Sequence, residues 1–104
     1  MALGARWTAV AKRDVLRTYA YLREWSQAGA RKFVEGVAET VARIEQFPEC
    51  GERAQNEEPE GGLRKVVCGR HVIYYRVGSD AFFVLRVWDA RRDPATLTIP
   101  ADPK

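Results

Sequence analysis

The sequence predicts a small α+β domain in which a helical hairpin packs on an antiparallel sheet. The chain has 104 residues, a common size for one domain. Two stretches with apolar residues at helical spacing come first, and three β-rich runs separated by short turns follow them. Hydrophobic residues make up 46% of the chain and charged residues 30%, which is ordinary for a globular protein. We therefore expect a short N-terminal strand, an antiparallel two-helix hairpin and an antiparallel sheet of about four strands.

The N-terminal half contains the strand and both helices. Residues 5–10 predict the strand, and residues 12–27 and about 30–47 predict the helices. Gly29 is expected to stop the first helix, because glycine adopts the left-handed cap conformation at little cost. Pro48 ends the second helix, since proline lacks the N–H that the next turn needs. Helices joined by so short a turn should be antiparallel neighbours.

Apolar residues at helical spacing predict one buried face on each helix. These residues are Val15, Leu16, Tyr19, Leu22 and Trp25 in the first helix, and Phe33, Val34, Val37, Val41 and Ile44 in the second.

The C-terminal half is predicted to be a meander of three strands. Its turns are too short for the crossover that parallel strands require. The expected segments are a loop over 48–62, strands over 63–68, 71–77 and 81–88, and a tail over 95–104. The domain itself is expected to span residues 1–94.

Charge is unevenly distributed along the chain. Residues 45–60 contain six glutamates and one arginine, a net charge of −5, whereas residues 63–92 contain seven arginines or lysines and two aspartates, a net charge of +5. Such a split predicts a polarised surface that suits an acidic partner or a nucleic acid on one side. The alternative is an ordinary solvated pair of arginine-rich strands.

Strict alternation assigns the residues of the last two strands to two faces. It places Ile73, Tyr75, Val77, Phe83, Leu85 and Val87 toward the helices. The outer face then keeps several aromatic, aliphatic and arginine side chains, a composition typical of a protein interface. We predict that this face binds a partner through Tyr74, Arg76, Phe82, Val84, Arg86 and Trp88. The alternative is that the C-terminal tail folds back and covers this face.

The sequence gives no indication of a metal, a cofactor or a membrane span. A zinc site needs about four clustered ligands, whereas Cys50, Cys68 and His71 are the only cysteines and histidine. Two unpatterned cysteines fit a reducing cytoplasm. No apolar run approaches the ~20 residues of a membrane helix.

No standard catalytic constellation is visible either. The arginines are the remaining candidates, since a guanidinium can hold a phosphate through a planar fork. A metal-free nuclease would also need a proton donor and a proton acceptor, for which Tyr74, His71 and Asp89 are candidates. The alternative is that the arginines pair with an acidic segment of a partner.

Four short motifs, in order, resemble the ParE/RelE superfamily of type II toxin–antitoxin toxins. The resemblance covers about residues 6–94. The motifs are Phe47-Pro48-Glu49-Cys50-Gly51, Gly61-Gly62-Leu63-Arg64, Val72-Ile73-Tyr74-Tyr75-Arg76-Val77, and the terminus from Val84 to Asp93-Pro94.

The resemblance to the RelE-like ribosome-dependent mRNA endonucleases is incomplete. Arg64, Lys65 and Arg91 could serve as nuclease residues of that branch. However, Val72 stands at about the place of an expected arginine, and no tyrosine follows Tyr75. The ending Arg91-Arg92-Asp93-Pro94 is more similar to the ParE branch.

The ParE resemblance implies a growth-inhibiting toxin, of a kind also linked to plasmid stabilisation, that poisons DNA gyrase. It implies a hetero-oligomer with a ParD-like antitoxin (RelB-like in the other branch). Arg64, Arg91 and Arg92 are then the expected target-binding residues, and the outer sheet face is the expected antitoxin site. A third interpretation is a toxin-fold protein without toxicity that binds an antitoxin and represses transcription with it.

Overall fold

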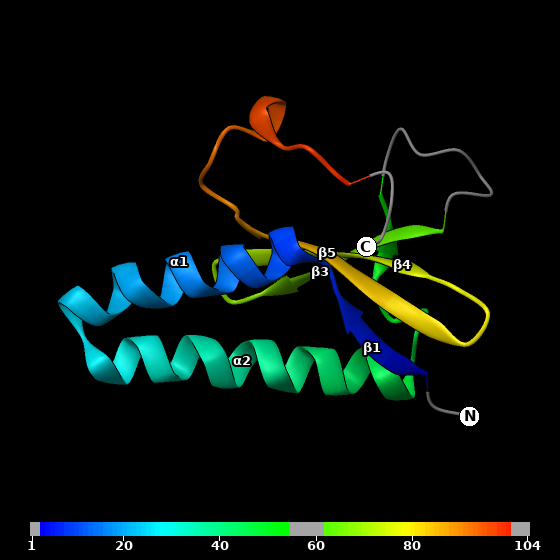
Figure 1. Ribbon diagram of the computed structural model, residues 1–104, viewed down its shortest axis with the longest axis horizontal. Helices are drawn as coiled ribbons and strands as arrows, with labels where there is room; N and C mark the ends of the chain where they lie inside the picture. Colours follow the sequence, from blue (N-terminus) through cyan, green and yellow to red (C-terminus); the bar gives the residue numbers. More distant parts are fainter. Residues whose placement is uncertain (1–2, 55–61, 101–104) are drawn as a thin grey trace.

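The computed structural model describes residues 3–54 and 62–100 and has the predicted α+β architecture (Figure 1). The elements are β1 (Gly4–Trp7), α1 (Ala9–Trp25), α2 (Gln27–Gln46), β2 (Glu52–Arg53), β3 (Leu63–Cys68), β4 (His71–Val77), β5 (Ala81–Asp89) and a 3-10 helix, η1 (Pro94–Thr96). The two helices lie on one side of a single sheet, and the segment after β5 passes over the other side. Glu57, Glu58, Glu60 and Gly61 of the predicted loop lie outside the described residues.

Within the described residues, the sheet has five strands in the order β1-β5-β4-β3-β2. The predicted antiparallel meander of β3, β4 and β5 is confirmed. The sheet as a whole is mixed, however, because β1 pairs with β5 in parallel. The two-residue strand β2 adds a fifth member within the region expected to be loop. Both features depend on pairing between distant segments, which local sequence patterns do not encode.

Two hydroxyl side chains fix where the helices begin. Thr8 caps α1 by accepting a hydrogen bond from the N–H of Ala11 at 3.0 Å, and its hydroxyl faces the carbonyls of Val84 and Leu85. Ser26 caps α2 by accepting from the N–H of Gly29 at 3.0 Å. Serine and threonine oxygens satisfy the free N–H groups at a helix start. The predicted stop at Gly29 is therefore wrong, because Gly29 lies in the first turn of α2.

The buried face of α2 is largely as predicted. Val37, Val41 and Ile44 lie in the core with strand residues such as Ile73 and Tyr75. The prediction for α1 is wrong in part, since Leu16 is 68% exposed and Trp25 is 75% exposed; on α2, Val34 is exposed as well. The far end of the hairpin projects beyond the strands (Figure 1), so Trp25 has no sheet to pack against.

A β-bulge changes which residues of β5 face the helices. Tyr74 pairs with Arg86 and Tyr75 pairs with Val84, which leaves Leu85 as an extra residue. One extra residue reverses the alternation of side chains along a strand. Phe82 and Val84 consequently lie in the core beneath the helices, and their predicted position on the outer face is wrong.

Candidate functional site

The β5 residues predicted to bind a partner are buried. Phe82 and Val84 have no exposed surface, Trp88 is 3% exposed and Arg86 is 9% exposed. The segment from η1 onward supplies part of the cover over Arg86, because both its backbone and its side chain at Thr98 accept hydrogen bonds from Arg86. The alternative prediction was that the C-terminal tail covers the outer face of the sheet. At Arg86 this prediction is correct, because Thr98 lies over its guanidinium group.

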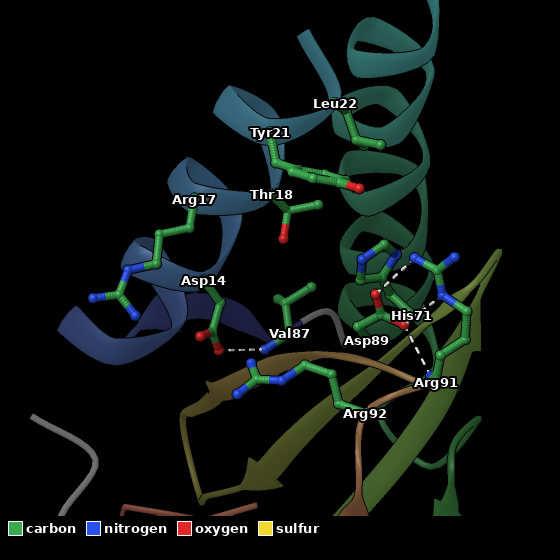
Figure 2. A pocket seen from close by; sticks show the side chains of 10 residues that line it. All are labelled: Asp14, Arg17, Thr18, Tyr21, Leu22, His71, Val87, Asp89, Arg91 and Arg92. Atoms are coloured by element: carbon green, nitrogen blue, oxygen red, sulfur yellow. Dashed lines mark hydrogen bonds and ion pairs between the residues drawn. The ribbon is translucent and has the colours of Figure 1, made fainter. Parts of the chain in front are cut away.

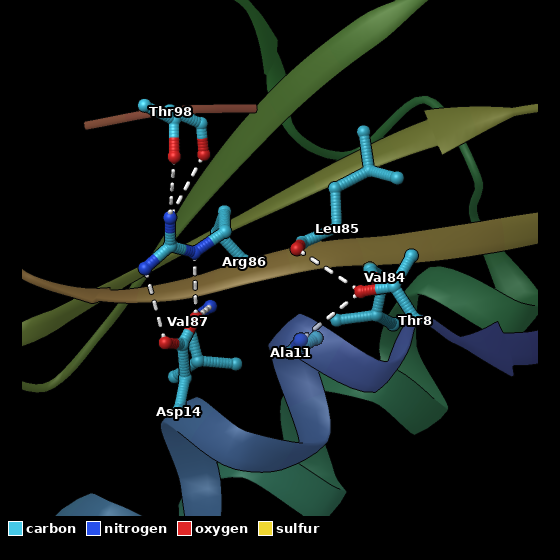
Figure 3. A network of polar contacts seen from close by, with 8 residues as sticks. All are labelled: Thr8, Ala11, Asp14, Val84, Leu85, Arg86, Val87 and Thr98. Atoms are coloured by element: carbon cyan, nitrogen blue, oxygen red, sulfur yellow. Dashed lines mark hydrogen bonds and ion pairs between the residues drawn. The ribbon is translucent and has the colours of Figure 1, made fainter. Parts of the chain in front are cut away.

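Arg86 is the centre of a polar network that joins three segments (Figure 3). Its Nε donates to Asp14 Oδ2 at 2.8 Å, and its second terminal nitrogen donates to Asp14 Oδ1 at 3.1 Å. The remaining terminal nitrogen donates to the Thr98 carbonyl at 2.8 Å. Asp14 also accepts the backbone N–H of Val87 at 3.0 Å. The network links α1, β5 and the C-terminal segment, so its first role is structural.

Trp88 contacts two guanidinium groups. The Arg86 guanidinium carbon is 5.0 Å from the ring centroid and that of Arg92 is 4.2 Å from it. Cation–π contacts of this kind favour a fixed guanidinium orientation. The arrangement therefore holds Arg92 close to the end of β5, although the residue as a whole stays exposed.

Tyr74 and Arg76 keep part of the outer face accessible. Both are half-buried, and both lie on the face of β4 opposite to the core residues Ile73 and Tyr75. Of the predicted antitoxin-binding residues, these two retain the most exposed surface.

Arg64 and Lys65 lie on opposite faces of β3. Arg64 is paired with the core residue Tyr75 and donates to the Gly51 carbonyl at 2.7 Å. Lys65 is paired with Tyr74 on the outer face, and its ammonium lies 3.8 Å from Glu52. The two residues therefore do not converge on one bound phosphate.

The Tyr75 hydroxyl completes a network at the end of α2. It donates to the Pro48 carbonyl at 2.8 Å and accepts from the Gly51 N–H at 2.9 Å. Burial raises the pKa of Tyr75 above its usual value of 10.0, with the Gly51 N–H acting in the opposite direction. With Arg64, these contacts fasten the chain that leaves α2 to the sheet.

A surface pocket of about 210 Å³ lies between α1 and the C-terminal end of β5 (Figure 2). It is lined by Asp14, Arg17, Thr18, Tyr21, Leu22, His71, Val87, Asp89, Arg91 and Arg92. Figure 2 shows Arg17 and Arg92 on the Asp14 side and Arg91 on the His71 side. The pocket thus brings together four residues that the sequence singled out, namely His71, Asp89, Arg91 and Arg92.

Asp89 and Arg91 form a paired group on one wall of the pocket. Arg91 donates to both carboxylate oxygens of Asp89, at 3.2 and 3.0 Å, and its backbone N–H donates at 2.9 Å. The side-chain hydrogen bonds from Arg91 hold the pKa of Asp89 below its usual value of 3.8. Asp89 is therefore a charged acceptor rather than a proton donor near neutral pH.

His71 forms the adjoining floor and is 8% exposed. Its ring contacts that of Phe33 of α2 in a tilted arrangement, with centroids 4.8 Å apart and planes inclined at 53°. Burial lowers the pKa of His71 below 6.5, more than the Asp89 carboxylate raises it, and Arg91 lowers it further. His71 is thus a neutral imidazole at neutral pH.

The candidate nuclease residues do not form one site. Arg91 lies in the pocket beside His71, whereas Arg64 pairs with Tyr75, four residues farther along β4. At about 3.3 Å per residue that separation is roughly 13 Å. Tyr74 lies on the other face of the sheet from Arg64. The geometry provides no convergent acid, base and phosphate clamp from these residues.

The sequence patterns did not single out Asp14, Arg17 or Thr8. Asp14 could have been noticed, because it is an acidic residue on the side of a predicted helix that faces the sheet, and a buried carboxylate needs a partner. No sequence signal indicated that Arg17 would share a pocket with Arg92, since that depends on how the hairpin is placed.

Neither a metal site nor a membrane helix is found in residues 3–54 and 62–100. No three histidine, cysteine or acidic residues cluster there in a way that could hold a metal ion. No helix in this part of the chain has the length and apolarity to cross a membrane.

The architecture defines a class, namely small α+β domains with a helical hairpin on a mixed sheet and two arginines after the last strand. The family described as "ParE toxin of type II toxin-antitoxin system, parDE" matches residues 5–94. The chain therefore belongs to the ParE toxin family, as the sequence motifs predicted.

A solved structure described as "Chromosomal ParDE TA system from P. aeruginosa" has the same fold. It is 22% identical in sequence, with a TM-score of 0.69, and the match covers 86% of this chain and 98% of that one. A search of curated proteins by sequence gave no match.

Proposed function

We propose that the protein is the toxin of a type II toxin–antitoxin pair, that it inhibits DNA gyrase, and that a cognate ParD-like antitoxin neutralises it in the cytoplasm. The observation that carries this proposal is the match of the ParE toxin family to residues 5–94. The similar structure from P. aeruginosa is described as a ParDE system, which supports an antitoxin partner and a hetero-oligomer here.

The arrangement of the arginines supports a binding mechanism over a nuclease mechanism. Arg64 is engaged with the carbonyl of Gly51, and Arg91 lies at the other end of β4. A nuclease of this fold would need basic residues around one phosphate together with a proton acceptor and donor. A toxin that binds its target needs only an exposed complementary surface.

Arg91 and Arg92 are the residues we assign to the target, because both are exposed in the turn that follows β5. Arg64 would reach a target only after releasing Gly51. The antitoxin is assigned to the outer sheet face at Tyr74 and Arg76. Arg86 could join that surface only where Thr98 withdrew from it, and Trp88 is itself buried.

The proposal is tested with purified protein in a gyrase supercoiling reaction. The toxin should inhibit supercoiling, and adding the antitoxin encoded by the neighbouring reading frame should restore it. Inhibition that no antitoxin reverses would contradict the assignment to a toxin–antitoxin pair.

A further inference from the structure

We propose that the pocket between α1 and the end of β5 binds the carboxylate of an acidic segment of a protein partner. The ligand is defined by its carboxylate, whether the protein that carries it is the proposed target or another partner. Three arginines and two aspartates line the pocket, so its formal charge is positive while His71 is neutral.

The two aspartates are already satisfied. Both oxygens of Asp14 accept from Arg86, and one of them also accepts the Val87 N–H. Both oxygens of Asp89 accept from Arg91. Neither carboxylate is therefore available to neutralise the remaining arginines.

Arg17 and Arg92 supply the uncompensated positive charge. Within the described residues, neither forms an ion pair, and both are exposed. Arg92 is held by its stacking on Trp88 and by its backbone N–H, which donates to the Asp89 carbonyl at 3.0 Å. A guanidinium fixed in advance loses less conformational freedom when it binds a carboxylate.

The rest of the lining favours a peptide ligand. Thr18 and Tyr21 place hydroxyl groups toward the pocket in Figure 2, and Leu22 adds an apolar wall. Tyr21 also contacts the ring of Trp25, with centroids 6.3 Å apart, and these two residues are 56% and 75% exposed. Exposed aromatic rings beside arginines are typical of protein interfaces.

A nucleic acid is the less favoured ligand for this pocket. Proteins that bind a phosphate backbone neutralise several consecutive phosphates with spread lysines and arginines. Here two aspartates lie among the arginines, and α1 also exposes the aromatic residues Tyr21 and Trp25 beside them. A single carboxylate flanked by apolar side chains fits this pattern better.

The test is a nuclear magnetic resonance titration of the full chain with two blocked peptides, N-acetyl-Leu-Glu-Leu-amide and its Gln counterpart. We expect shifts at backbone amides around the pocket, and binding of the Glu peptide about tenfold tighter than that of the Gln peptide. Equal binding of the two peptides, no binding of either, or shifts elsewhere would overturn the proposal. So would tighter binding of inorganic phosphate or a short DNA duplex at the pocket.

Substitutions of arginine test which side chains bind the carboxylate of the peptide. Arg17→Gln combined with Arg92→Gln should abolish the preference for Glu over Gln. The matched control is Arg13→Gln combined with Arg23→Gln, which removes two exposed arginines of α1 outside the pocket. Because Arg92 packs on Trp88, Arg17→Gln alone serves as a second variant that leaves that contact in place. Retention of the full preference in both Arg17 variants would contradict the assignment.

Discussion

Asp14 and Arg86 form an ion pair between α1 and β5 in which each side chain is only 10% exposed. Arg86 donates to both oxygens of the Asp14 carboxylate. The Val87 N–H donates a further hydrogen bond to Asp14, and Thr98 accepts a further one from Arg86. Such a pair adds little net stability but leaves a costly unpaired charge when one partner is removed. The pair fixes α1 against the end of β5, which is also where the pocket lies.

Arg86→Met should destabilise the protein by about 3 kcal/mol, because it leaves the Asp14 carboxylate buried without its cation. Urea denaturation measures this free energy of unfolding. The double variant with Asp14→Asn should recover part of the loss, since it removes the stranded charge. A double variant that is less stable than Arg86→Met alone would contradict this account.

Gly51→Ala should destabilise the protein by at least about 2 kcal/mol. A methyl group at this position would lie 2.7 Å from the Tyr75 hydroxyl and 2.8 Å from the Lys65 carbonyl. Thermal denaturation should show the loss, and Gly4→Ala is the control because no atom lies within 4 Å of its added Cβ. Equal melting temperatures for the two variants would show that the contact yields without cost.

Stability should fall as the pH drops below about 6.5. Burial lowers the pKa of His71 in the folded state, so the unfolded chain takes up the proton first. The free energy of unfolding is therefore unaffected by His71 at pH values above 6.5, the pKa of His71 in the unfolded chain. It declines as the pH falls from there toward the lower pKa of His71 in the folded protein. Asp89 does not interfere in this range, because its own pKa lies below 3.8.

Urea midpoints at about pH 7.5 and about pH 5.5 measure this effect. The wild type should lose stability between the two, and His71→Gln should lose less. A wild type that becomes more stable at the lower pH would rule out the buried neutral imidazole.

Arg91→Ala combined with Arg92→Ala should reduce toxicity by at least about tenfold in the concentration of protein needed to stop growth. Both residues are exposed, so the fold should survive the loss of the contact between Arg92 and Trp88. Arg13→Ala with Arg23→Ala is the matched control, with the same charge loss on a different surface. If both double variants lose toxicity equally, general charge rather than this turn is responsible.

The helices and the meander were predictable because their signals are local. The helical spacing of apolar residues correctly predicted that Val37, Val41 and Ile44 are buried. Turn residues correctly predicted where the three strands are separated. The parallel pairing of β1 with β5 and the bulge at Leu85 depend on contacts across the chain, so alternation placed Phe82 and Val84 on the wrong face. Of the site, the sequence identified Arg91, Arg92, His71 and Asp89 as candidates but could not bring them together with Arg17.

The most direct test of the proposed function is a gyrase supercoiling assay run beside a translation reaction. The account predicts that the purified protein inhibits supercoiling of relaxed plasmid, traps cleaved DNA, and leaves mRNA on translating ribosomes intact. Unchanged supercoiling together with cleavage of ribosome-bound mRNA would contradict it and support the nuclease branch. Inactivity in both assays, with antitoxin binding retained, would instead support a protein that only binds its antitoxin.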